Sequence, residues 1–248
     1  KSSTELIKFM SIKINYSQNK STKSSGNLVL FTDDKFSTNT LKKYLTDLEF
    51  SYISDLLRSS DLKKNLFVFE VNSKKKIVLI SIKKDLKTSD VENLGAEFYK
   101  RINQGKNCEY SINSDSVNVK NENFIGYFLH GLKLKSYEFK KYKTKKEKKV
   151  FSINILGNKK KYSTQSLLKF KALEEGTFFA RDLVSEPGNV LHPDEYAKRL
   201  TSLKKDGLKV YIYDEKKLKK MGMNALLGVG LGSIRGSYLV TMEWNGAK

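Results

Sequence analysis

The sequence has few of the cysteines and histidines on which disulfide-bonded and metal-stabilised folds depend. Its 248 residues include one cysteine, two histidines, two prolines and one tryptophan. The single Cys108 excludes an internal disulfide framework and fits a reducing compartment, and so few cysteines and histidines exclude an array of zinc fingers. The longest apolar runs, such as 28–31 and 77–80, are typical of buried strands and fall far short of the roughly 18 residues of a membrane-spanning helix. We therefore expect no membrane segment.

Arginine is also scarce, although the chain is strongly basic. The net charge of +20 is carried by 42 lysines and only five arginines. Cations that neutralise phosphates favour nucleic-acid binding, but base and phosphate recognition favours the forked guanidinium group of arginine. The densest segment, Lys133–Lys149, has nine lysines against Glu138 and Glu147. It predicts a solvated connection, with a nucleic-acid or acidic-partner patch as the alternative.

Hydrophobic residues make up 39% of the chain, enough to build a core. Runs rich in β-branched and aromatic residues alternate with runs whose apolar residues recur every three or four positions, which predicts an α/β layer fold. The expected strands are 12–16, 27–31, 66–71, 77–82, 109–112 and 150–156, with 66–71 and 77–82 forming a hairpin. Three helices are expected among these strands. The first has Leu41, Leu45, Leu48, Tyr52 and Leu56 on one face, and the second starts at Ser89-Asp90 and ends near Gly105. The third has Phe124, Phe128 and Leu132 on its apolar face.

In the last third of the sequence, proline, glycine and aspartate mark the ends of helices and strands more clearly. A long helix lined by Leu168 and Leu183 must end before Pro187, and Pro193 is placed to open a second helix that runs to Gly207. A strand at 208–212 follows, then a short helix capped by Asp214 and ending at Gly222, and two strands, 225–229 and 238–244, joined by a glycine-rich turn. Because the chain stops at Lys248 beside the last of these strands, we expect a truncated second domain.

Residue chemistry alone predicts no active site. His130 and His192 are far apart, so we expect a hydrogen-bonded structural role for the first and a capping or loop role for the second. Cys108 has no adjacent base to make it a nucleophile. The glycines of 228–232 lack the spacing of a dinucleotide-binding loop. Paired carboxylates diverge because they are adjacent in the chain, as at 33–34, 174–175 and 214–215.

Three stretches nevertheless resemble the leucyl aminopeptidase family, the cytosolic two-metal M17-type peptidases. The first is Gly131–Phe139 with Tyr142-Lys143-Thr144, which resembles a segment near the end of the family's amino-terminal domain. The second, Ala180–Pro193, resembles the segment that opens the catalytic domain. The third runs from Gly222 through Gly232-Ser233 to Trp244-Asn245-Gly246. Ser185, His192 and Gly236 depart from the family pattern.

The resemblance implies a macro-like amino-terminal α/β domain with a mixed sheet at 10–158, a linking helix at 159–186 and the beginning of the catalytic domain at 187–248. In this family the metal ligands and the catalytic Lys and Arg follow the position that matches Trp244-Asn245-Gly246. No catalytic, metal or cofactor-binding residue is therefore assigned, and Lys248 is not given a ligand role.

The expected function is that of a fragment of a metal-dependent leucyl aminopeptidase, itself inactive, which releases amino-terminal residues from peptides. The resemblance implies two divalent ions, manganese or zinc, in the full-length enzyme and none bound by this chain. It also implies a cytoplasmic homohexamer. The alternatives are a basic module that binds nucleic acid through 133–149 and a non-catalytic assembly domain.

Overall fold

The computed structural model describes residues 12–16, 26–103, 109–119, 123–144, 150–158 and 164–246. The chain divides into two compact units, 1–178 and 179–248, which are described separately below. The division falls inside the long helix α4 (Thr164–Ser185), so the greater part of α4 belongs to the first unit. Among the described residues, no helix combines the length and apolar character needed to cross a bilayer.

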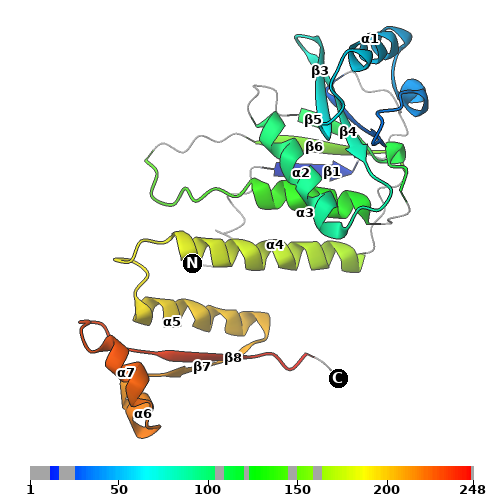
Figure 1. Ribbon diagram of the computed structural model, residues 1–248. Coiled ribbons are helices and arrows are strands. Elements are labelled where there is room, and N and C mark those ends of the chain that lie inside the picture. The colour runs from blue at the N-terminus through cyan, green and yellow to red at the C-terminus, as the bar shows by residue number, and fades with distance from the viewer. Residues whose placement is uncertain are drawn as a thin grey trace. The chain divides into compact units, whose positions relative to one another are not determined.

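A six-stranded mixed sheet forms the centre of the first unit (Figure 1). Five strands are parallel, and β3 runs antiparallel to β4 at one edge. Leu28–Phe31 and Ile77–Ile80 are fully buried, which explains why these central strands are continuous apolar runs. The spatial order is β1 (Ile12–Tyr16), β6 (Phe151–Leu156), β5 (Glu109–Asn113), β2 (Leu28–Asp33), β4 (Lys75–Ile82) and β3 (Leu66–Asn72).

Two hydrophobic clusters place one helical layer on each face of this sheet. Helices α2 (Thr88–Ile102) and α3 (Phe124–Lys135) bury their apolar residues in one cluster, where the ring of Phe31 lies 5.2 Å from Phe124 and 5.3 Å from Phe128. The 3₁₀ helix η2 (Asn39–Tyr44) and α1 (Asp47–Arg58) share the other cluster with Leu28, Leu30, Ile77 and Leu79. Alternate side chains of β2 and β4 therefore pack against the helices on opposite faces of the sheet.

Helices α2 and α3 approach each other so closely that their contact requires glycine. A Cβ atom on Gly95 would lie 1.9 Å from the carbonyl oxygen of Phe128 on α3. A Cβ on Gly131 would lie 1.9 Å from the carbonyl oxygen of Glu92 on α2. Since both obstacles are backbone atoms, no side-chain rotation can relieve them.

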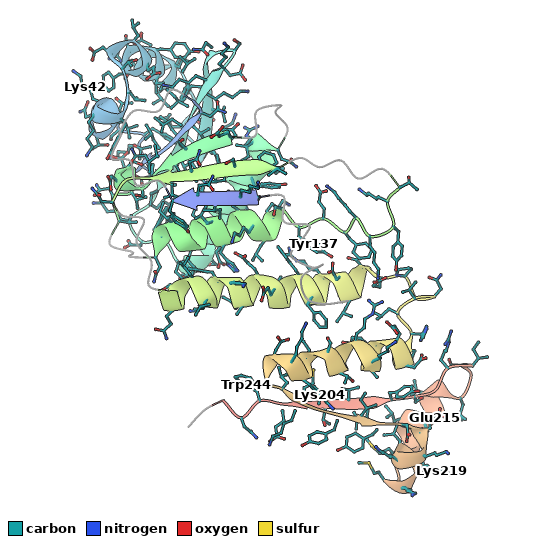
Figure 2. The ribbon with its side chains drawn as sticks, turned by 180° about the vertical axis from the view of Figure 1, so that it is seen from behind. Lys42, Tyr137, Lys204, Glu215, Lys219 and Trp244 are labelled. Carbon is teal, nitrogen blue, oxygen red and sulfur yellow. The ribbon has the colours of Figure 1, made fainter. Side chains whose placement is uncertain are left out.

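Helix α4 packs on α3 within the first unit. The Phe170 ring lies 5.0 Å from the ring of Tyr127, and a Cβ on Gly126 would lie 2.5 Å from that Phe170 ring. Further along, the rings of Phe178 and Tyr137, the latter just after α3, are 5.3 Å apart (Figure 2). Aromatic residues thus line the contact of α3 with α4.

The second unit is small and has few buried side chains. Its buried apolar residues are Ala197, Leu200, Val210 and Leu218, whereas Val229 and Ile234 are almost fully exposed. The Trp244 ring lies over Gly207, whose φ of 95° closes the turn before β7 (Figure 2). The elements are α5 (Pro193–Thr201), η4 (Ser202–Asp206), α6 (Glu215–Lys220), α7 (Asn224–Gly230) and the antiparallel pair β7 (Lys209–Tyr213) and β8 (Leu239–Glu243).

Most predicted elements are confirmed, including the hairpin of β3 and β4, but the segment 225–229 is not a strand. It lies in α7, because a short apolar run rich in alanine and leucine fits either structure. The helix predicted to start at Ser89-Asp90 begins at Thr88, with the Asp90 carboxylate accepting from the amide N–H of Lys87 at 3.0 Å.

The predicted helix face at 41–56 is also wrong. Thr46 forms a capping box with Glu49 and starts a new helix, so one continuous helix is replaced by two, η2 and α1. This break turns Glu49, Ile53 and Leu57 inward, whereas Leu48, Tyr52 and Leu56 are exposed; Leu41 and Leu45, the other predicted members, are buried. The buried carboxylate of Glu49 is compensated by an ion pair with Lys75, whose Nζ lies 2.6 Å from Glu49 Oε1.

We predict that Gly131→Ala lowers the free energy of unfolding by at least about 2 kcal/mol, because the new Cβ overlaps the backbone of α2. Urea denaturation followed by circular dichroism measures the change. Gly176→Ala on α4 is the matched control: its Cβ meets nothing within 4 Å, so the better helix propensity of alanine adds about 1 kcal/mol. Equal stability of the two variants would contradict the close helix contact.

Candidate functional site

In open α/β sheets, ligands bind outside the carboxyl ends of the parallel strands, where the strand order reverses. In this unit η3 (Ser114–Ser116), directly after β5, fills that position. Ser116 Oγ accepts from the amide of Phe31 at 3.0 Å and donates to the carbonyl of Asn113 at 2.7 Å. Ser114 Oγ donates to the carbonyl of Leu156 at 2.7 Å. These hydroxyls are used by the fold, so a ligand here would have to displace internal hydrogen bonds.

A charge cluster of buried and partly buried titratable side chains lies in the first unit where α2, α3 and α4 meet. His130, 5% exposed on α3, has Nδ1 2.8 Å from Oε1 of Glu92 on α2. One turn further along α3, Lys133 Nζ donates to Oε2 of Glu174 on α4 at 3.0 Å. The His130 ring also lies 5.5 Å from the ring of Phe170. These two contacts therefore join α3 to both neighbouring helices.

The charge cluster carries an electrostatic cost. Burial raises the pKa of Glu174, and this effect exceeds the attraction of Lys133, which lowers it. His130 Nε2 is buried and has no hydrogen-bond partner among the described residues. The hydrogen bond to Glu92 agrees with the structural role predicted for His130. The arrangement holds helices together and brings together no nucleophile and base.

In the second unit, the segment that resembles the opening of the catalytic domain is organised by Arg199. This residue of α5 donates from Nη1 to Oε1 of the buried Glu186 at 2.8 Å and from Nε to Oε1 of Glu195 at 3.0 Å. Burial opposes the charge of Arg199, but the two carboxylates outweigh it and raise the pKa of the guanidinium group. One cation thus ties the end of α4 to the first turn of α5.

His192 occupies the N-cap position of α5, as the position of Pro193 predicts, but its side chain makes no capping hydrogen bond. Its Nδ1 instead contacts Oδ1 of Asp194, and Arg235 Nη1 lies 3.7 Å from the other oxygen of that carboxylate. Although the little burial of Asp194 opposes ionisation, the hydrogen bond with His192 prevails and lowers the pKa of Asp194. The loop role predicted for His192 agrees with this placement.

The remaining candidates do not converge. Gly228 and Gly230 lie in the last turn of α7 rather than in a link between strands. Among the residues that the structure describes, no three or more His, Cys, Asp or Glu side chains form a group that could hold a metal ion. Cys108 and Lys248 lie outside the described residues.

The family comparison decides the identity. Residues 178–248 match the catalytic domain of the cytosol aminopeptidase family. A probable cytosol aminopeptidase of Brucella anthropi is 34% identical over 182 residues, covering 70% of this chain and 36% of that protein. The chain belongs to the cytosol aminopeptidase family. The predicted resemblance to the leucyl aminopeptidases is thereby confirmed, and a second such protein, from Chelativorans sp., is 42% identical over 127 residues, 48% of this chain and 25% of that protein.

Solved structures confirm the α/β fold. A mutant leucine aminopeptidase of tomato superimposes with a TM-score of 0.71 at 17% identity, covering 93% of this chain and 50% of that one. The bottromycin maturation enzyme BotP gives 0.65 at 14% identity, covering 90% and 46%. This chain spans about a quarter to a third of the curated aminopeptidases and about half of the solved ones.

Sequence reasoning missed the charge cluster, because Lys133 and Glu174 are 41 positions apart and both stand among like-charged or exposed neighbours. Lys133 also opens the lysine-rich segment, yet it is only 22% exposed. Lys140 in the same segment pairs with Glu138. The described part of the segment therefore differs from the predicted solvated connection at these two lysines; residues 145–149 lie outside the described residues.

We predict that Glu174→Gln changes the pH dependence of stability. With its pKa raised above the ordinary 4.5, folded Glu174 keeps its proton to a higher pH than unfolded Glu174 does. The free energy of unfolding therefore falls as pH rises from about 4.5 through the raised value, and Glu174→Gln removes this fall. Denaturation at a series of pH values measures it. The exposed neighbour supplies the control: the charge of Glu175 makes only a minor contribution to the raised pKa of Glu174, so Glu175→Gln should leave most of the fall in place.

A second prediction concerns Arg199→Lys. Lysine cannot form the two directed hydrogen bonds to Glu186 and Glu195, so we expect a loss of about 1–3 kcal/mol from the second unit. Fluorescence of Trp244, the only tryptophan, reports the unfolding of this unit. The neighbouring Lys198→Ala, whose side chain is 82% exposed, should change stability by less than about 0.5 kcal/mol. Similar losses in both variants would remove the special role of Arg199.

Proposed function

We propose that this chain forms part of a metal-dependent leucyl aminopeptidase that releases amino-terminal residues from peptides. The single observation that carries the proposal is the match of residues 178–248 to the family's catalytic domain. Arg199, Glu186 and Glu195 fix the start of that segment on α5. In the proposed arrangement, 10–158 is a macro-like amino-terminal domain, 159–186 a linking helix and 187–248 the beginning of the catalytic domain.

The proposed enzyme uses two divalent ions, manganese or zinc, and one structure of the fold neighbour BotP is a complex with Mn. Such ions polarise a scissile carbonyl and activate water, which requires several carboxylates or imidazoles in one pocket. The described residues do not fit this requirement, since they provide no such group of His, Cys, Asp or Glu. We therefore assign the described residues a scaffolding role and no catalytic one.

The wider setting of the proposed enzyme follows from the family. It acts on peptides in the cytoplasm and assembles as a homohexamer. The curated relatives are named cytosol aminopeptidases, which supports the compartment. The nucleic-acid alternative has less support, because Lys133 and Lys140 of the lysine-rich segment are paired with carboxylates.

We predict that the purified 248-residue chain does not hydrolyse leucyl-amide substrates in the presence of Mn²⁺ or Zn²⁺, because the described residues lack a ligand set for these ions. Release of the amide product in a colorimetric assay measures turnover, with the full Brucella anthropi relative as the positive control. Metal-dependent turnover that a chelator abolishes would contradict the scaffolding role.

A chimera tests the family function itself. Residues 178–248 replace the matching segment of the Brucella anthropi relative, and the chimera is assayed with Mn²⁺. Retained metal-dependent turnover supports the proposal that the segment is a working part of an aminopeptidase. A folded chimera of the same assembly state without turnover would count against it.

A further inference from the structure

Strand β3 leaves one side of the mixed sheet open. It is the last strand in the spatial order, and no described strand pairs with its outer side. The strand is seven residues long and mostly apolar, and Val68, its third residue, is 39% exposed. A long apolar edge of this kind offers a row of backbone donors and acceptors to a further strand.

The pairing of β3 with β4 fixes which backbone groups face outward. Ser81 N donates to the carbonyl of Asn65, and the register continues through Phe67 opposite Leu79 and Phe69 opposite Ile77. Hydrogen-bonded pairs alternate along an antiparallel ladder, so the odd-numbered residues bond to β4. The backbone N–H and C=O groups of Leu66, Val68 and Glu70 therefore point away from β4. Tyr52 Oη donates to the carbonyl of Glu70 at 3.3 Å, leaving Leu66 and Val68 as the open stretch.

The charges at the ends of this stretch are opposite in sign. Lys64 precedes β3 and Glu70 lies near its end, and both line, together with Leu66 and Val68, a hollow of about 440 Å³ on the face that α2 covers. Arg101 and Tyr110 also line it. The hollow gives room for side chains that a further strand would bring onto this face.

We propose that two copies of this chain associate through β3, paired antiparallel about Phe67. This register places Leu66 opposite Val68 of the second copy and Lys64 opposite Glu70 of the second copy, and the two-fold symmetry repeats both pairs. Leu66, Val68 and Glu70 have outward backbone groups, so Leu66 and Val68 meet as hydrogen-bonded pairs. Extension of the same alternation to Lys64, which precedes the strand, pairs its backbone with that of Glu70. A register about Val68 would instead place Leu66 opposite Glu70, which sets a charge against an apolar side chain.

Within the chain, the Tyr52 hydroxyl competes with the second copy for the Glu70 carbonyl. The Tyr52 hydroxyl leaves the Glu70 carbonyl, and the N–H of Lys64 of the second copy takes its place. Glu70 also pairs with Lys76 within the chain, so the new contact shares its carboxylate between two lysines. This inference does not depend on the peptidase assignment, since it uses only the edge of the first unit.

Sedimentation velocity over a range of protein concentrations tests the proposal. Val68→Pro removes an outward N–H and leaves the hydrogen bonds to β4 intact, so we expect the dissociation constant to rise at least about tenfold. Val68→Thr, which keeps the N–H and the β-branched shape, should stay within about threefold of the wild type. Circular dichroism confirms that both variants are folded.

A charge exchange tests the register. Lys64→Glu and Glu70→Lys should each weaken association, and the double variant should recover a large part of it, because the opposite charges face each other again. A wild-type chain that stays monomeric at the highest concentration reached would overturn the proposal. Association of Val68→Pro that equals the wild type, or a double variant weaker than both single variants, would overturn it equally.

Discussion

The first unit depends on the backbone contact between α2 and α3. Gly95 and Gly131 let the two helices approach until each Cβ position would overlap a carbonyl group of the other helix. Such an approach leaves α3 no freedom to rotate about its own axis. The face of α3 opposite the sheet is therefore fixed, and it carries Gly126, His130 and Lys133. Helix α4 meets this face with Phe170 and Glu174, so its place is set by two glycines it never touches.

The two units are stabilised by different interactions. The first has two extensive hydrophobic clusters, one on each face of its sheet. The second buries few apolar side chains and instead connects its elements by polar contacts, such as those of Arg199 and the hydrogen bond from the Ser237 amide to Glu215. Directed polar contacts add less net stability than apolar burial of similar extent. The second unit is accordingly the more sensitive to single changes of charge.

Much of the fold could be predicted because local patterns and tertiary packing agree. Pro193, Gly207 and Asp214 mark helix ends at the positions where the structure has them. The failures occur where a local signal was ambiguous or outweighed: the apolar run at 225–229 fits a strand or a helix, and the cap at Thr46 overrides the periodicity from Leu41 to Leu56. The pair of Lys133 with Glu174 could not be predicted, because it depends on how α3 is oriented rather than on spacing in the chain.

The pairing of β1 with β6 also determines the order in which the sheet can form. Asn15 and Asn154 are 139 positions apart and hydrogen-bond across these two strands, whereas β3 and β4 meet through a short turn. Contacts between distant residues form more slowly than local ones, because a long loop must close first. During synthesis, β1 must therefore wait until β6 has left the ribosome. Of the strands that the structure describes, β1 precedes the others in the chain, yet it is among the last to join the sheet.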